Sequence, residues 1–555
     1  ADLSGIVALG LPLLALGSGA DLLLSHAGSP APAERLPGGL AEIRVDAARP
    51  LFSGLTEQQQ VLLEGGVHEP GAAPGFTVAA RLEDGTPAAF ISEERRTAAL
   101  LFHPEADLTE NGMQMLQNFL ERLAGLDRNY VLEDRIETAL GDIREQVGDR
   151  PVFALVSGGV DSAVTAALLS KALPANQVHA LHVDTGFMRK DESAGVVREL
   201  RAMGLENLRH VEAGDRFFDG RVEAADGTII GPLTELFDPE VKRELVGNMF
   251  MEVLRDELQE LDFDFDTAFF AQGTLRPDLI ESGNPDVSEQ AQNIKTHHND
   301  VPAVRRAREE GRVVETNADW HKDEVRQVAR DLGLSEEIAS RQPFPGPGLV
   351  LRVMTWDGSD TVPEDLDGRI SRRLGRDGGE LELRTFPIRS VGVDGDARSY
   401  RFLTFVAPGD LTDPALNRAG QLIAGGFQEV NRVAAVLAGR APLGALQAWP
   451  STIDRGQVDL LREVDAFART ELHDMPSSQM FCLVLPLGTE AGRCTVALRS
   501  IITNDYMTGR HTRLEADYPA ARLRAWAEAV LDRFPAVDAV VYDITGKPPA
   551  TVEWQ

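Results

Sequence analysis

Cysteine is almost absent from this 555-residue chain, which has only Cys482 and Cys494. Two cysteines exclude a disulfide scaffold and a cysteine-rich zinc module, and they are typical of a protein in a reducing cytoplasm. Positive charge is also scarce, because 55 lysines and arginines face 87 aspartates and glutamates and leave a formal net charge of −32. So acidic a surface disfavours non-specific binding to nucleic acid or anionic membranes. An anionic substrate would therefore need a local basic pocket.

The chain also lacks a long uninterrupted hydrophobic run. Its most apolar stretch, residues 6–24, is broken by Gly17, Gly19 and Asp21, and no basic segment precedes it. We therefore expect a buried strand-turn-helix segment here, and neither a signal peptide nor a membrane span.

Length and composition predict three or four domains, because 555 residues exceed one ordinary core. Apolar residues make up 43% and charged residues 26%, which is typical of a globular protein. We place the domains at 1–125, 126–348 and 349–555, with an α+β pattern in the last. A rigid proline- and glycine-rich loop at 343–348 marks the second boundary.

Five short apolar segments alternate with helical patterns in the middle domain. They are residues 152–156, 178–183, 208–211, 267–271 and 312–314. Unbroken apolar strands are typical of a parallel sheet that is covered on both faces. The pattern predicts a doubly wound α/β domain with a parallel five-stranded sheet, and ligands beyond the carboxyl ends of its strands.

The first of these strands leads into a candidate phosphate-binding loop. It runs directly into Ser157-Gly158-Gly159-Val160-Asp161-Ser162, and a helix follows. The glycines bring backbone N–H groups close to an anion, and the helix N-terminus and serine hydroxyls add donors. No Gly-Lys-Ser/Thr follows, so this is not a Walker A loop. The alternative interpretation is a capped helix after a glycine turn.

The hexapeptide resembles the pyrophosphate loop of the N-type ATP pyrophosphatases. Later blocks resemble the GMP synthetase members of that family in particular. These blocks are residues 182–190, 271–282, 294–299, 321–326, 341–349 and 547–554. The resemblance runs in register from about residue 127 to the C-terminus.

The resemblance implies a ligase that aminates xanthosine 5′-monophosphate (XMP) to GMP. The 2-oxygen of XMP would attack the α-phosphate of ATP and release pyrophosphate, and ammonia would then displace AMP. The implied cofactors are ATP and Mg²⁺, with Mg²⁺ held mainly by the ATP phosphates and no dedicated protein ligands. The implied ammonia source is free ammonia or glutamine.

The resemblance also assigns residues. Asp161 and Lys322 would be catalytic. ATP and pyrophosphate would be held by Ser157, Gly158, Gly159, Val160, Asp161, Ser162, Val183 and Lys322. XMP would be held by Arg276, Arg398, Gln479, Lys547, Thr551 and Glu553. The adjacent His297 and His298 have no further ligand at a zinc-like spacing, so we predict no metal site there.

Residues 1–125 resemble the latter part of a class I glutamine amidotransferase, an α/β domain. His103 and Glu105 match the histidine and glutamate of its catalytic triad, whose nucleophile is a cysteine on a strand-to-helix turn. Aligning Gly10 with that turn puts Ala8 where the cysteine belongs and Pro12 where glutamine is usual. We expect this degenerate domain to lack the opening that carries the oxyanion-hole glycines and to be unable to hydrolyse glutamine.

The C-terminal domain would complete the nucleotide site and mediate homodimerisation, and an insertion near 402–476 resembles the larger, eukaryote-like form of the family. We expect a cytoplasmic enzyme that binds neither nucleic acid nor a membrane. Two alternatives stay open: another amidating pyrophosphatase such as NAD synthetase, and a catalytically silent nucleotide-binding scaffold.

Overall fold

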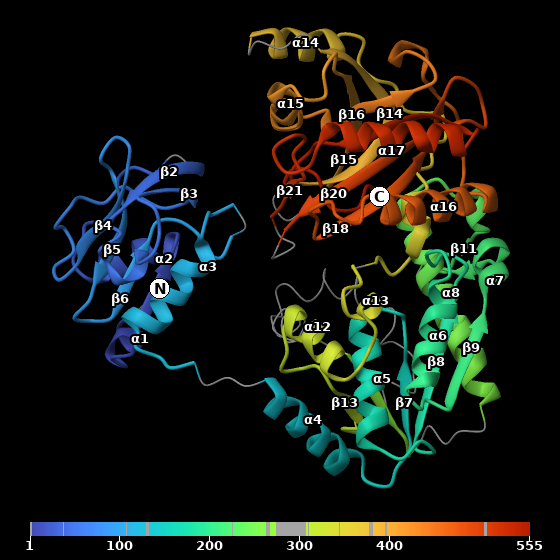
Figure 1. Ribbon diagram of the computed structural model, residues 1–555, viewed down its shortest axis with the longest axis horizontal. Coiled ribbons are helices and arrows are strands. Elements are labelled where there is room, and N and C mark those ends of the chain that lie inside the picture. Colours follow the sequence, from blue (N-terminus) through green and yellow to red (C-terminus); the bar gives the residue numbers. More distant parts are fainter. Residues whose placement is uncertain are drawn as a thin grey trace. The chain divides into compact units, whose positions relative to one another are not determined.

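The structure is a computed structural model (Figure 1). It describes residues 3–36, 38–106, 108–128, 132–224, 226–261, 267–273, 307–308, 310–342, 344–376, 381–394, 397–503 and 508–555. The chain divides into two compact units, one of Ala1–Tyr130 with Thr503–Arg510 and one of Val131–Ile502 with His511–Gln555. Among the described helices, none is both long and apolar enough to cross a membrane.

The first unit is built on a mixed sheet in the order β1-β6-β5-β4-β2-β3. Its strands are β1 (Leu13–Leu16), β2 (Gly39–Val45), β3 (Gln58–Leu63), β4 (Thr77–Leu82), β5 (Pro87–Ser92) and β6 (Thr97–Leu100). Its helices are α1 (Ser4–Ala8), α2 (Ser18–His26) and α3 (Gly112–Asn118), with a π-helical turn at Phe119–Leu123 and a 3-10 turn at Pro50–Phe52. Among the strands described in this unit, only β1 and β6 pair in parallel, and α2 packs on both.

Apolar packing holds this unit together. Leu24 of α2 and Phe90 of β5 are buried in one core with Phe52 and Phe102. The expected strand-turn-helix at the start of the chain is present, but it is confined to β1 and α2. Ile6 and the residues around it are exposed.

The second unit begins with α4 (Leu132–Val147) and a parallel five-stranded sheet, as predicted (Figure 1). The strands are β7 (Val152–Leu155), β8 (Val178–Asp184), β9 (Asn207–Glu212), β12 (Phe269–Gln272) and β13 (Val313–Glu315), in the order β13-β12-β7-β8-β9. Its helices are α5 (Val160–Ala172), α6 (Glu192–Ala202), α7 (Gly214–Asp219), α8 (Pro239–Glu260), α12 (Lys322–Asp331) and α13 (Glu336–Ala339). A small hairpin joins β10 (Val222–Glu223) to β11 (Ile229–Ile230), and 3-10 turns lie at Leu233–Glu235 and Gly348–Arg352.

Alternation of side chains explains why this sheet is buried on both faces. Phe153 and Leu181 enter one hydrophobic core, and Val152 and Ala154 enter another. The chain leaves β7 toward β8 and β9 and returns on the other side of β7 to β12 and β13. The order of strands therefore reverses beside β7, which is where doubly wound sheets bind ligands.

The rest of the second unit is α+β, as predicted. Its main sheet has the order β14-β15-β16-β22-β20-β18. The strands are β14 (Glu382–Asp394), β15 (Ala397–Ala407), β16 (Val430–Gly439), β18 (Gln479–Leu485), β20 (Cys494–Ile502) and β22 (Val537–Asp543), with the small pair β17 (Gln447–Ala448) and β19 (Leu487–Gly488). The helices are α14 (Leu366–Arg376), α15 (Pro414–Ala424), α16 (Arg455–Glu471) and α17 (Ala520–Arg533), with a 3-10 turn at Leu443–Ala445. Helix α17 packs on β16 and β22, and α16 packs on β18.

Candidate active site

The loop of residues 157–162 joins the end of β7 to the start of α5. Ser162 Oγ accepts a hydrogen bond from Ser157 N at 3.2 Å and donates to Gly159 O at 3.1 Å, which closes the turn. Gly158 has a φ of 90°, which favours glycine. A Cβ there would also come within 3.3 Å of Val196. The predicted strand, glycine turn and helix N-terminus are therefore all present, with Val160 as the first residue of α5.

Lys322 and Asp161 meet at this loop although 161 residues separate them. Lys322 Nζ donates to Asp161 Oδ2, while Asp161 Oδ1 is buried and has no hydrogen-bond partner among the described residues. Lys322 is the first residue of α12, and Asn317, just before that helix, donates to Asp161 O at 3.0 Å. The structure thus brings together the two predicted catalytic residues, with one carboxylate oxygen available to a ligand.

Strand β8 lies next to β7 and carries Val183, the residue predicted to contact ATP. Val183 is buried near the carboxyl end of β8. Its neighbour His182 is fully buried and donates from Nδ1 to Val156 O at 2.7 Å, which ties β8 to the residue just before the loop. Burial lowers the pKa of His182, so its imidazole is neutral at physiological pH.

The predicted XMP residues lie in the C-terminal part of the second unit, except Arg276, which falls outside the described residues. Arg398 on β15 pairs through Nη1 with Glu240 Oε1 at 2.7 Å. Gln479 is buried at the start of β18. Arg398 is paired across the sheet with Val393, whose N–H donates to Pro549 O at 2.8 Å, close in sequence to Lys547.

Thr551 and Glu553 lie together in the C-terminal segment. Thr551 Oγ1 donates to Val391 O at 3.0 Å. The Glu553 carboxylate accepts from Arg352, with Nη2 at 2.7 Å and Nε at 3.1 Å. Arg432 Nη2 donates to the carbonyls of both residues at 3.1 Å. Buried arginines therefore hold this segment in place.

These arginines were missed by the sequence analysis. Arg432 and Arg499 are both fully buried and contact the carboxylate of Asp543 at 2.7 and 3.1 Å. Burial alone would raise the pKa of Asp543, but Arg499 and Arg432 hold it below its ordinary value. The sequence does carry a signal for Arg432 and Arg499, since each stands inside a mostly apolar strand. Charged residues are rarely buried unless they are paired.

The first unit contains a second strand-to-helix turn, and it corrects one prediction. Ala8 is the last residue of the short helix α1 and therefore cannot be the nucleophile position. The turn lies instead at Gly17, between β1 and α2, with φ 51° and ψ −125°. An alignment of the turn with Gly10 would place residues 13–15 in the helix after it, but Leu13 to Leu16 form the strand itself, because they pair with β6.

His103 and Glu105 lie at this turn. His103 Nδ1 donates to Glu105 Oε1 at 2.7 Å, and a Cβ on Gly17 would be 2.7 Å from His103 Nε2. The same nitrogen lies 2.9 Å from Glu64 Oε2, a contact that the sequence analysis missed. Burial lowers the pKa of His103, but the hydrogen bonds to Glu105 and Glu64 outweigh it and the pKa is raised. The histidine thus faces a glycine and a carboxylate where a triad would have a thiol.

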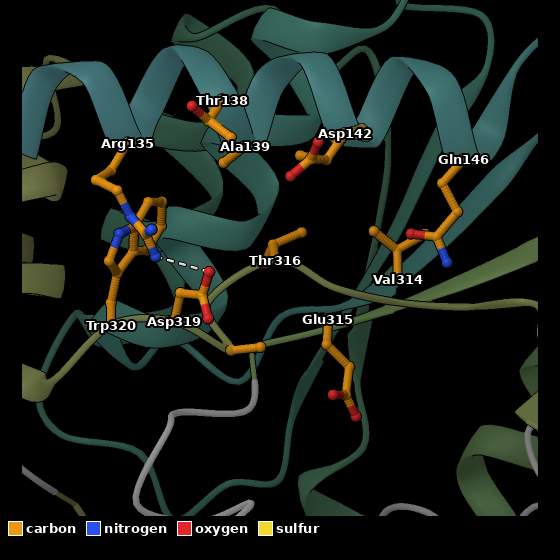
Figure 2. Close-up of a pocket in the computed structure, with 12 residues that line it drawn as sticks. Arg135, Thr138, Ala139, Asp142, Gln146, Val314, Glu315, Thr316, Asp319 and Trp320 are labelled. Atoms are coloured by element: carbon orange, nitrogen blue, oxygen red, sulfur yellow. Dashed lines mark hydrogen bonds and ion pairs between the residues drawn. The ribbon is translucent and has the colours of Figure 1, made fainter. Parts of the chain in front are cut away.

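A separate pocket lies between α4 and the segment that follows β13 (Figure 2). Arg135 on α4 and Asp319 on the opposite wall form an ion pair at 2.6 Å. Its volume of about 160 Å³ is below the roughly 300 Å³ at which small-molecule sites begin. It contains none of the predicted site residues that the structure describes, so we assign it no role in the reaction.

Comparison with known proteins matches three families along the chain. Residues 5–123 match glutamine amidotransferase class-I, residues 135–226 match asparagine synthase, and residues 474–554 match the GMP synthase C terminal domain. A probable glutamine-hydrolysing GMP synthase from Caenorhabditis elegans is 35% identical over 98% of this chain and 83% of its own length. The glutamine-hydrolysing GMP synthase from Dictyostelium discoideum is 34% identical over 91% of this chain and 76% of its own.

The comparisons agree with the site. An amidotransferase-like unit, a phosphate-loop domain with its lysine and a C-terminal domain of the matching kind occur in one chain, and these relatives align with that chain over most of their own length. The chain therefore belongs to the GMP synthase family.

Proposed function

We propose that this chain aminates XMP to GMP with ATP and free ammonia, and that its amidotransferase unit does not hydrolyse glutamine. The first half rests on family membership and on the loop at residues 157–162 with Lys322. The second half rests on one observation: the residue at the strand-to-helix turn beside His103 is Gly17, which has no side chain to act as a nucleophile. Both cysteines of the chain lie far from Gly17 and His103 in sequence, at positions 482 and 494.

The reaction proceeds in two balanced steps. The 2-oxygen of XMP attacks the α-phosphorus of ATP, the bond to the bridging oxygen breaks, and pyrophosphate leaves. Ammonia then adds to the activated carbon of the base, a proton is lost, and AMP departs with the oxygen. Such transfers depend on positioning and charge neutralisation. The backbone N–H groups of the loop and the Lys322 ammonium supply both to the leaving pyrophosphate.

Magnesium fits this site. Asp161 Oδ1 is a buried carboxylate oxygen without a hydrogen-bond partner among the described residues, and hard divalent cations prefer oxygen ligands. When bound, Mg²⁺ would neutralise charge on the ATP phosphates, which hold it mainly. Asp161 would orient that complex, and its other oxygen would keep Lys322 directed at the same phosphates.

XMP would bind through residues of the C-terminal part. Arg398 has a guanidinium suited to forking onto a phosphate, and its present partner Glu240 would have to yield to the anion. Gln479, Lys547 and Thr551 would contact the phosphate, ribose or base. Arg276 and Glu553 complete the proposed XMP set, with Glu553 held by Arg352.

Ammonia would reach the activated base from solution. At the turn in the first unit the Glu64 carboxylate takes the hydrogen bond that His103 Nε2 would give to a thiolate. His103 therefore has an acceptor on each side and no nucleophile to activate.

We further propose that the protein is a cytoplasmic homodimer. The net charge of −32 argues against nucleic-acid and membrane partners.

The decisive experiment supplies the purified chain with XMP, ATP and Mg²⁺, and either an ammonium salt or glutamine. GMP, AMP and glutamate are quantified by chromatography. We expect GMP and AMP in equal amounts with ammonium, and neither GMP nor glutamate with glutamine. GMP formation from glutamine alone would overturn the loss of glutaminase. No AMP under any condition would favour a silent scaffold, and amidation of deamido-NAD in place of XMP would favour an NAD synthetase.

A further inference from the structure

Three hydrogen-bond donors of the second unit converge on one carboxylate oxygen, Glu240 Oε1. Arg398 Nη1 lies at 2.7 Å, Arg243 Nη1 at 2.6 Å and the Tyr400 hydroxyl at 2.5 Å. Glu240 and Arg243 belong to the first turns of α8, whereas Arg398 and Tyr400 stand on β15. We call these four residues the Glu240 cluster. Its two halves come together only in the folded protein, because Glu240 and Arg398 are 158 residues apart.

The periodicity of the two elements explains why these side chains meet. Residues three apart on a helix lie on one face, so Glu240 and Arg243 point the same way from α8. Residues two apart on a strand also share a face, as Arg398 and Tyr400 do on β15. Of these four residues, the sequence analysis assigned a role only to Arg398.

The first turn of α8 is held in place by other residues. Lys242 is fully buried, and its Nζ donates to Gln555 Oε1 at 2.6 Å and to Thr355 Oγ1 at 3.1 Å. Asp238 caps the helix, because its Oδ1 accepts from the N–H of Glu240 at 2.7 Å. A ligand that competes for the donors of the cluster would therefore move the side chain of Glu240 and leave the helix where it is.

The Glu240 cluster is accessible to solvent. The side chains of Glu240 and Arg398 are 50% and 37% exposed, and that of Arg243 is 20% exposed. Burial alone would raise the pKa of Glu240, but the Tyr400 hydroxyl and the two guanidinium groups hold it below its ordinary value. Glu240 is therefore ionised at neutral pH, and the three donors already surround an anionic oxygen in the free protein.

A phosphate group suits these three donors better than the carboxylate does. A phosphate monoester carries about two negative charges at pH 7 and has three terminal oxygens, so each donor can bind an oxygen of its own. In the free protein, by contrast, all three donors share Glu240 Oε1. Exposed ion pairs contribute little stability, and the half-exposed Glu240 can turn into solvent. Phosphate can therefore displace the carboxylate at little cost.

We propose that Glu240 occupies the place of the XMP phosphate in the free protein, and that Arg243 and Tyr400 bind this phosphate together with Arg398. The inference rests on the proposed function, because it takes XMP as the ligand of Arg398. Glu240 is a positioning residue: it holds two guanidinium groups side by side that would otherwise repel each other, and it yields them to the nucleotide. Its negative charge competes with the phosphate and lowers the affinity for XMP.

Binding is measured by equilibrium dialysis of the full chain against radiolabelled XMP, which requires no catalysis. Glu240→Gln keeps an acceptor oxygen for the donors but removes the competing charge. We therefore expect the Kd for XMP to fall about two- to fivefold, the contribution of an exposed ion pair. Arg243→Gln and Tyr400→Phe each remove a donor and should raise this Kd about threefold or more. The Kd for ATP, measured on the same variants, should stay unchanged.

A second ion pair on the same helix supplies the matched control. Asp256, near the end of α8, pairs with Arg216 at 2.8 Å, and the two side chains are 54% and 42% exposed. Distance and exposure thus resemble those of Glu240 and Arg398. Asp256→Asn removes one charge of an exposed pair, as Glu240→Gln does, and should leave the Kd for XMP unchanged.

The direction of the change separates this inference from a purely structural link between α8 and β15. Such a link predicts weaker XMP binding in Glu240→Gln, so an unchanged or raised Kd in the folded variant would overturn the role of Glu240. Tyr400→Phe and Arg243→Gln decide the case in which Glu240→Gln fails to fold, and an unchanged Kd in both refutes the shared phosphate site. If the parent itself binds no XMP, the proposed function fails, and this inference fails with it.

Discussion

The two strand-to-helix turns of this protein share a backbone plan and differ in chemistry. In the second unit, β7 leads through the loop at 157–162 into α5, and the serines, Asp161 and Lys322 are all in position. In the first unit, β1 leads through Gly17 into α2, and the residue at the turn has no side chain. His103 and Glu105 nevertheless keep their hydrogen bond.

The difference shows that a strand-to-helix turn can be held by backbone hydrogen bonds and apolar packing alone. Gly17 N donates to Leu100 O at 2.8 Å, and the buried Ala20 and Leu24 anchor α2 against the sheet. None of these interactions involves a side chain at position 17, so the turn forms without one. The loop in the second unit has no such independence, because Asp161 and Ser162 take part both in its hydrogen bonds and in its proposed chemistry.

The largest expected effect on activity comes from substitutions at the loop of residues 157–162 and its partner Lys322. Asp161→Ala and Lys322→Ala should each lower AMP formation from XMP, ATP and ammonium by about a hundredfold or more, since each removes charge positioned for the transition state. Initial rates of AMP release measure this, and circular dichroism checks the fold. Lys171→Ala, at the exposed far end of α5, is the control and should turn over normally. Unchanged rates in both variants would refute the assignment.

The second prediction introduces a thiol at the turn of the first unit. Gly17→Cys should give a thiol that reacts slowly with alkylating agents and a protein without glutaminase activity. The reason is that the Glu64 carboxylate takes the hydrogen bond of His103 and disfavours a nearby thiolate. Adding Glu64→Ala should let His103 pair with the thiolate and speed alkylation by iodoacetamide several-fold. The buried Cys482 and Cys494 provide the internal background. If Gly17→Cys alone releases glutamate from glutamine, the proposed role of Glu64 is wrong.

A smaller effect is expected at the residues of the second unit that we propose for XMP. Arg398→Ala should raise the KM for XMP about tenfold and leave the KM for ATP nearly unchanged, since a charge-assisted hydrogen bond to phosphate contributes about 1.5–3 kcal/mol. Arg389→Ala on the neighbouring strand β14, which pairs with Asp360, is the matched control. Equal changes in both KM values would argue against a role for Arg398 in XMP binding.

The smallest effect concerns the protonation of His103. Its folded pKa is raised, so its contribution to stability is fully present below the unfolded value of 6.5 and is lost as the pH rises through the raised value. Glu64→Gln should shift the His103 titration, followed by proton NMR, to lower pH. Glu93→Gln, which removes an exposed carboxylate of the same unit, should leave it in place. If Glu64→Gln leaves the His103 titration unchanged, the 2.9 Å contact between His103 and Glu64 is weak.

Much of the second unit could be predicted from its residues. Five apolar segments and the Ser-Gly-Gly loop carry their own local signals, so the parallel sheet and the phosphate turn were both expected correctly. The strand-to-helix turn of the first unit was placed wrongly, because α1 and β1 are both short and both rich in apolar residues. Only the pairing of β1 with β6 decides which of them is the strand.

By itself, the sequence determined the central sheet, the phosphate loop and the absence of any thiol from the first 481 residues, because periodicity, glycine placement and composition are local properties. Tertiary structure alone decided that Gly17 faces His103, that Glu64 accepts from it, that Asp161 meets Lys322, and that Arg398 meets Glu240. These are contacts between residues far apart in the chain. Their geometry is set by how sheets and helices pack, which no local pattern records.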